Sequence, residues 1–398
     1  MNATSPTGPP LTPARTRPAH APSSGANSAR PTITELRLSA FRTHRGVNFP
    51  LGPLTLFAGA SGSGKSSALQ AYEALARLGA GEELDSVFPD PSACVPESAE
   101  ADGQGRRGFR IGCTVDGPAG PVQLDLAVQA EPELRVVGER LTSGGRILLA
   151  TALRDPGRST VQAAWHTAGA VAVTRAPLPD DRLGTALLPL RVAGKTQGQL
   201  QVLAAAEQVV VALRSVFACD PQPHRMREPV AAGEGRLRRG CDNLAEVLHR
   251  TRSECAIRHA RLAAAARVGC AGGVEELAVE ELGDGTVRAL LGRGTARVAT
   301  PLGRLGEGEL RYLALALVLL TGPGVLAMDQ AAEVPAAYQA LTVLADGFDR
   351  CLDPRQARQL VALGVEMAAR GHVRLVGAVA DASYARGVDG VTVVDLVT

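Results

Sequence analysis

The chain has 398 residues, 45% of them apolar, which is ample for the core of one large or two ordinary domains. Lys and Arg number 42 and Asp and Glu 40, so the formal net charge of +2 lacks the basic excess typical of a dedicated nucleic-acid-binding protein. The seven cysteines form no C-x-x-C pair, which argues against a zinc site or a disulfide framework and favours reduced thiols in the cytoplasm.

Residues 1–31 are rich in Pro, Ser, Ala and Arg and contain no acidic residue. This composition predicts a disordered tail; it resembles a transit peptide only in its arginines, because the prolines oppose an amphipathic helix. The longest apolar run, "YLALALVLL" at 312–320, is too short to span a bilayer, so no membrane partner is expected.

Short strands are predicted at 33–41 and 54–59, on either side of the turn "THRG", followed by a helix to about residue 78. Residues 80–104 are acidic and broken by proline, which is typical of an exposed loop. From 108 to 173 apolar and polar residues alternate in short runs, which predicts an antiparallel β region.

The remaining chain alternates between helices and strands. Amphipathic helices are predicted at 199–217 and 243–268, and strands at 276–282 and 286–291. A strand "GVLAMD" at 324–329, helices from Pro335 and from Pro354, and strands at 373–380 and 391–396 complete the pattern. We therefore predict an α/β domain over 32–398, split by an inserted β and helical region at about 105–275.

The stretch "LTLFAGASGSGKSSALQAY" at 54–72 fits G-x-x-x-x-G-K-[ST] between a strand and a helix. In such a loop, glycines let backbone N–H groups point at phosphates, the lysine adds a compact cation, and the following hydroxyl reaches Mg²⁺. The alternative is a plain glycine-rich turn before a helix. The predicted nucleotide contacts are Gly59, Ser61, Gly62, Ser63, Gly64, Lys65, Ser66 and Ser67, with Ser66 also a metal ligand.

A second element of such sites is an apolar strand ending in an Asp that contacts the Mg²⁺ shell. The sequence "VLAMDQ" at 325–330 fits this description and makes Asp329 the predicted metal ligand. Because apolar strands that end in Asp are common, this prediction gains weight only together with the segment just upstream.

That segment, "RLGEGELRYLALALVLL" at 304–320, resembles the signature of ABC-type ATPases in the form seen in the SMC, RecF and OLD-like group of AAA-family ATP-binding proteins. The segments "PLGPLTLFAGASGSGKSS" at 50–67 and "GCDNLAEVLHR" at 240–250 resemble the same group. The resemblance implies a P-loop NTPase of ABC or RecF-like type, with ATP and Mg²⁺ held in a homodimer interface. The residues that would face the partner's ATP are Gly306, Glu307, Gly308 and Glu309; the alternative for them is a glycine-capped core helix.

Several residues depart from the group's pattern. Gln330 stands where the group has the Glu that activates water, and a neutral amide cannot accept that proton. Glu333 is the alternative carboxylate if the segment forms a helical turn, and Asp381 lies near the place of the group's switch His. Gly306 replaces the signature Ser, and Gln104 is a provisional choice for the expected glutamine between phosphate loop and signature.

The resemblance leads to an ATPase, converting ATP to ADP and phosphate, whose dimerisation controls a DNA-related or defence activity through a separate effector such as a nuclease. The alternative is a hydrolysis-deficient, nucleotide-gated binding protein, which Gln330 favours. A P-loop kinase or GTPase would leave "LGEGELR" unexplained, and no N-K-x-D motif is present.

For DNA contact, the sequence offers an arginine-rich stretch at 224–262. Its acidic residues and the scarcity of aromatics favour a solvated helix face instead. The arginines concerned are Arg225, Arg227, Arg236, Arg238, Arg239, Arg250, Arg252, Arg258 and Arg261.

Overall fold

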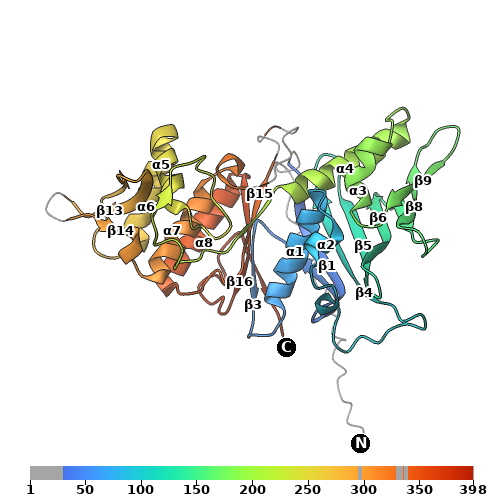
Figure 1. The fold of residues 1–398 in the computed structure, drawn as a ribbon, viewed down its shortest axis with the longest axis horizontal. Helices are drawn as coiled ribbons and strands as arrows, with labels where there is room; N and C mark the ends of the chain where they lie inside the picture. The colour runs from blue at the N-terminus through green and yellow to red at the C-terminus, as the bar shows by residue number, and fades with distance from the viewer. Residues whose placement is uncertain (1–29, 295–297, 329–334, 336–338, 398) are drawn as a thin grey trace, which may run out of the picture.

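The computed structural model describes residues 30–294, 298–328, 335 and 339–397, so nearly all of the predicted tail lies outside the described residues. The described chain forms layers around a parallel sheet, with an antiparallel sheet and its helices on one side and a helical layer on the other (Figure 1).

The parallel sheet brings together distant parts of the sequence. Its strand order is β10 (Val216–Cys219), β15 (Leu341–Ala345), β16 (Val373–Val379), β3 (Leu54–Ala58) and β17 (Val391–Asp395). Every neighbouring pair is parallel. Both faces are covered, which is why β3 and β15 are buried throughout and read as continuous apolar runs. The predicted mixed α/β fold is confirmed, although β10 comes from the segment predicted as an insertion.

The predicted antiparallel region is also confirmed, and the N-terminal hairpin joins it. The strand order is β2 (His44–Pro50), β1 (Thr32–Phe41), β4 (Arg107–Asp116), β5 (Val122–Glu131), β6 (Arg135–Ser143), β7 (Arg146–Ala152), β8 (Thr160–His166) and β9 (Val173–Pro179). One face packs on α1 (Lys65–Gly79), α3 (Gly184–Arg191) and α4 (Gln197–Arg214), and these apolar residues form one of two core clusters.

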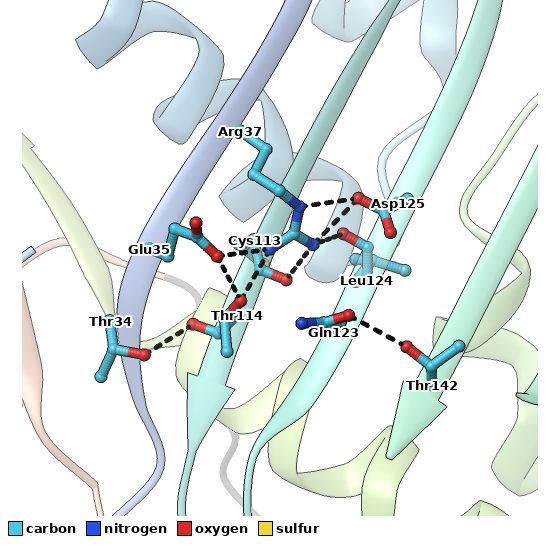
Figure 2. A network of polar contacts seen from close by, with 9 residues as sticks. All are labelled: Thr34, Glu35, Arg37, Cys113, Thr114, Gln123, Leu124, Asp125 and Thr142. Atoms are coloured by element: carbon cyan, nitrogen blue, oxygen red, sulfur yellow. Dashed lines mark hydrogen bonds and ion pairs between the residues drawn. The ribbon is translucent and has the colours of Figure 1, made fainter. Parts of the chain in front are cut away.

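The opposite face of the antiparallel sheet carries polar side chains. Figure 2 shows Arg37 on β1 donating to the Asp125 carboxylate at 2.9 Å, to Glu35 at 2.9 Å and to the Thr114 hydroxyl at 2.6 Å. One guanidinium thereby joins β1, β4 and β5 and satisfies two carboxylates. This face obeys the alternation expected of a sheet with one side in water.

The helical layer on the other side of the parallel sheet holds the second core cluster. It consists of α5 (Leu244–Glu254), α6 (Ala256–Gly269), α7 (Glu307–Leu320), α8 (Pro354–Ala369) and a small sheet of β11 (Val230–Ala231), β12 (Glu276–Glu281), β13 (Thr286–Gly292) and β14 (Thr300–Pro301). Short helices lie at α2 (Leu84–Val87), η1 (Ser92–Cys94), η2 (Leu302–Arg304) and η3 (Pro323–Val325).

Three predicted elements are corrected. The helix expected over 199–217 ends at Arg214, and Val216–Cys219 form strand β10 of the parallel sheet.

The single helix expected over 243–268 is broken at Cys255, whose φ of −149° is not helical. The hydroxyls of Thr251 and Ser253 bond to the carbonyls of Leu248 and Arg250 and compete with helical hydrogen bonding before the break.

The strand expected over 324–329 is absent from its described part, 324–328. A 3₁₀ turn occupies Pro323–Val325, and Leu326 forms one isolated bridge to Leu237. The helix predicted from Pro335 falls on residues that the structure largely does not describe.

All seven cysteines are described, and their thiols are free. Within the described ranges no helix is long and apolar enough to cross a membrane, and no group of three or more His, Cys, Asp and Glu is placed to hold a metal ion.

Candidate functional site

The glycine-rich loop links β3 to α1, as the sequence predicts. β3 ends at Ala58 and α1 begins at Lys65. Between them Gly59, Gly62 and Gly64 have φ of 153°, 85° and 93°, a region that side chains bearing a Cβ rarely adopt. The strand, loop and helix required for a phosphate loop are therefore present.

The loop is also packed closely on both sides. A Cβ on Gly64 would lie 2.6 Å from the Thr43 hydroxyl and 2.7 Å from His44 Cε1, in the turn between β1 and β2. A Cβ on Gly59 would lie 2.5 Å from the carbonyl oxygen of Leu396, just after β17. Any larger residue at Gly59 or Gly64 would therefore clash with these neighbours and displace the loop.

His44 holds the loop by a direct hydrogen bond. Its Nε2 lies 3.0 Å from the carbonyl oxygen of Gly64, and because a carbonyl only accepts, the imidazole donates. The ring is 5% exposed and packs edge-on against Phe49, which packs in turn on Phe57 of β3. Burial lowers the pKa of His44, while the Gly64 hydrogen bond opposes that shift.

The polar groups of the loop suit an anion. Lys65 Nζ donates to the carbonyls of Gly59 and Ala60, both at 2.7 Å. The first turn of α1 contains no acidic residue, so no carboxylate offsets the positive end of the helix. The Ser63 hydroxyl is buried without a hydrogen-bond partner, a situation that a phosphate oxygen would resolve.

The serines predicted to contact nucleotide differ in exposure. Ser61 and Ser66 are exposed, and Ser67 is half-buried in the first turn of α1. Ser66, the predicted metal ligand, follows Lys65 directly.

Asp346 follows β15 at the same edge of the parallel sheet as the phosphate loop. Carboxyl ends of parallel strands share an edge, and only β16 separates β15 from β3. With strands about 4.8 Å apart, β15 and β3 lie about 10 Å from each other. Asp346 is half-buried and thus fits the predicted context of the metal-binding Asp.

Asp329, the residue chosen from sequence, lies outside the described residues, as do Gln330 and Glu333. The described residues before it form no strand of the parallel sheet. The sequence "LTVLAD" at 341–346 is an equally apolar run that ends in Asp, and this signal was overlooked.

The residue after Asp346 is Gly347. As with Gln330 after Asp329, the position after the candidate metal ligand therefore has no carboxylate. Its φ is 59°, and a Cβ there would lie 3.1 Å from Arg350 Nε. A glutamate at 347 would therefore be strained, and the loop is built for glycine.

Among the other carboxylates at this edge, those of Asp349 and Asp381 are engaged. Asp349 Oδ2 accepts from the backbone N–H groups of Ala380 and Asp381 at 2.9 and 3.2 Å. Asp381, after β16, accepts from the Ser383 amide at 2.8 Å and hydroxyl at 2.6 Å, and these bonds lower its pKa. Asp381 thus forms a local turn close to where the sequence placed it.

The predicted signature residues begin α7. Gly306 and Glu307 are exposed, whereas Gly308 and Glu309 are half-buried. The Glu309 carboxylate accepts from the amides of Gly306 at 3.1 Å and Ala271 at 2.8 Å, so it caps its own helix. Gly306 and Glu307 are therefore the residues of this set that remain open to a partner.

Gln104 lies in an exposed turn before β4, where its backbone N–H donates to the Asp102 carboxylate at 2.9 Å. Gln222 is a second candidate for the expected glutamine, because it follows a strand of the parallel sheet. It follows the parallel strand β10 by three residues, and its backbone N–H donates to the Gly240 carbonyl at 2.9 Å.

Most members of the arginine-rich stretch are paired. Arg236 lies 3.6 Å from Glu234, Arg238 lies 2.7 Å from Asp242, and Arg239 pairs with Glu73. Arg250 and Arg261 pair with Glu254 and Glu366. These contacts favour a solvated, charge-balanced face over a DNA-binding one.

We predict that His44 makes stability depend on pH. Its folded pKa lies below the ordinary value of 6.5, so the unfolded chain binds the proton more readily and stability falls as pH drops below about 6.5. In urea titrations at pH 7.5 and 5.5, His44→Gln should lose less stability than the wild type over this interval. His224→Gln, at an exposed histidine, is the control; identical pH dependence in His44→Gln and wild type would contradict the prediction.

Comparison with known proteins gives structural likeness only. No protein-family model matches the chain, and no curated protein matches it significantly. Among solved structures, an SMC head bound to the C-terminal winged-helix domain of ScpA is 14% identical, with a TM-score of 0.49, over 87% of this chain and 90% of that one.

Two further SMC structures are similar. An SMC head with an extended coiled coil, bound to the C-terminal domain of ScpA and derived from Pyrococcus furiosus, is 11% identical, with a TM-score of 0.47, over 88% of this chain and 90% of that one. The SMC head domain from Thermotoga maritima is 13% identical, with a TM-score of 0.42, over 92% and 99%. At such values, function has to be argued from the chain's own residues.

Proposed function

We propose that this chain is an ATP-binding protein of ABC type, in the form of the SMC, RecF and OLD-like group, which forms a homodimer around ATP and Mg²⁺. The observation that carries the proposal is the phosphate loop and Asp346 at one edge of a single parallel sheet. Lys65 and the amides at the start of α1 would hold the phosphates, and Ser66 and Asp346 would hold Mg²⁺. The bound metal ion would neutralise phosphate charge.

Dimerisation is part of the proposal because Gly306 and Glu307 are exposed at the start of α7. Glu307 and Glu309 in the first turn of that helix offset its positive end, and the Glu309 carboxylate already accepts from the Gly306 amide, so a phosphate supplied by a second copy would compete with this cap. A DNA-related or defence activity in the cytoplasm, through a separate effector such as a nuclease, remains part of the same proposal.

The residues around Asp346 support slow hydrolysis as part of the proposal. Gly347 has no side chain to activate water, and Asp349 accepts two backbone hydrogen bonds that occupy one of its oxygens. These observations support the second candidate, a hydrolysis-deficient nucleotide-gated binding protein that regulates a partner.

The two lysines of the chain provide a direct test of nucleotide binding. Lys65→Ala removes the cation of the phosphate loop, whereas Lys195→Ala removes an exposed lysine elsewhere. In titrations with a fluorescent ATP analogue, Lys65→Ala should weaken binding by at least about tenfold, because a charge-assisted hydrogen bond contributes about 1.5–3 kcal/mol. Lys195→Ala should match wild type. Equal affinities for wild type, Lys65→Ala and Lys195→Ala would contradict the proposal.

Asp346→Asn and Asp329→Asn distinguish the two candidate metal ligands. If Asp346 holds Mg²⁺, Asp346→Asn should raise the Mg²⁺ concentration needed for half-maximal nucleotide binding by about 10-fold or more. Asp329→Asn should then need the same Mg²⁺ concentration as wild type. The measurement is a Mg²⁺ titration at fixed nucleotide. The reverse ranking would restore Asp329, the residue indicated by sequence.

Hydrolysis can be measured as single-turnover phosphate release, with Lys65→Ala as the blank. We expect wild type to stay close to the blank, because loss of a general base removes on the order of 10²–10⁴-fold in rate. Release far above the blank would show that another carboxylate acts in place of the missing glutamate. Asp349→Asn, Asp381→Asn and Glu333→Gln would then identify it.

A further inference from the structure

A buried arginine on α7 contacts two loops that leave the parallel sheet. Arg311 is 2% exposed. Its Nη1 donates to the Pro221 carbonyl at 2.7 Å and its Nη2 to the Gly347 carbonyl at 2.9 Å. Pro221 follows β10 and Gly347 follows β15, so one guanidinium joins α7 to two adjacent strand ends.

The first turn of α7 touches the same loop at closer range. A Cβ on Gly308 would lie 2.2 Å from the Cys351 carbonyl oxygen, so helix and loop are in backbone contact. The Cys351 thiol donates to the Glu307 carboxylate at 3.6 Å. Together with Arg311, these contacts connect the exposed start of α7 to the segment that begins at Asp346.

The charge of Arg311 is poorly suited to a purely stabilising role. The nearest carboxylate, Asp220, is 4.0 Å from Nη1, and Nε has no hydrogen-bond partner. Burial, with Arg350 nearby, lowers the pKa of Arg311. A buried cation without a close carboxylate costs free energy that an apolar side chain of similar volume would avoid. What the guanidinium provides, and an apolar chain cannot, is simultaneous contact with two carbonyls.

We propose that Arg311 is a positioning residue that couples the start of α7 to Asp346. The inference rests on the proposed function: the start of α7 meets the partner's nucleotide, and Asp346 holds the metal ion of its own subunit. Closure of the dimer against Gly306 then fixes Gly347 through Arg311, and metal binding at Asp346 in turn favours the closed dimer. This coupling is reciprocal, as linkage requires.

The coupling is measurable as a ratio of two dimer dissociation constants. Sedimentation equilibrium with a non-hydrolysable ATP analogue gives one constant with Mg²⁺ and one with EDTA. For wild type we expect a ratio of about 5- to 150-fold, the range typical of coupled sites. Arg311→Met should bring the ratio close to one. A variant that merely lost stability would shift both constants and leave their ratio intact.

Arg374 supplies the matched control. Its guanidinium also donates to backbone carbonyls, those of Ile33 at 3.2 Å, Leu51 at 3.0 Å and Gly52 at 2.8 Å. Arg374 is near the start of β16, so it lies toward the opposite end of the sheet from Asp346. Arg374→Met should therefore lower stability while keeping the wild-type ratio.

Arg311→Lys keeps the charge but loses the planar fork, and we expect a ratio between those of wild type and Arg311→Met. If Arg311→Met does not fold, this variant decides the question, and a wild-type ratio in it overturns the inference. A wild-type ratio in Arg311→Met, or a ratio near one in Arg374→Met, overturns it as well.

The same experiments distinguish failure of the proposed function from failure of the coupling through Arg311. A wild type that binds no nucleotide overturns the proposed function and this inference together. A wild type that binds nucleotide but stays monomeric, or dimerises equally with and without Mg²⁺, leaves nucleotide binding intact and overturns the coupling.

Discussion

Parallel pairing of β3 with β16 and β17 is the constraint on which the site depends. Parallel strands place all their carboxyl ends along one edge, so the loops after β3, β10, β15 and β16 meet there although they lie far apart in sequence. Such a sheet needs cover on both faces. α1 and α4 with the antiparallel sheet supply one cover, and α7 and α8 supply the other.

The phosphate loop could be predicted because its determinants are local. Three glycines at positive φ, a lysine and a helix start lie within seven residues of sequence, and each residue type has its own steric or electrostatic reason. The supports of the loop, Thr43 and His44 on one side and Leu396 on the other, could not be predicted. They come from the two ends of the described chain and meet only through strand pairing.

The same distinction separates the two candidate metal ligands, Asp329 and Asp346. Several apolar runs end in Asp, among them "VLAMD" and "LTVLAD", and composition does not separate these two. Long-range pairing does, since β15 lies between β10 and β16 whereas Leu326 makes a single bridge. The break at Cys255 is a similar case, because helical periodicity continues through it while side-chain bonds to backbone carbonyls precede the interruption.

The loop after Asp346 lacks a side chain at Gly347, but the position of its backbone is closely fixed. Gly347 offers no group to activate water, yet its carbonyl is held by a buried arginine, and its positive φ excludes most other residues without strain. These contacts and the positive φ therefore fix the backbone conformation of the loop. Under the proposed function, this shape would hold a metal ion and transmit its presence to α7, and neither task consumes nucleotide. Under the proposed function, a loop that keeps these contacts while Gly347 offers no carboxylate suits a nucleotide-dependent switch better than rapid turnover.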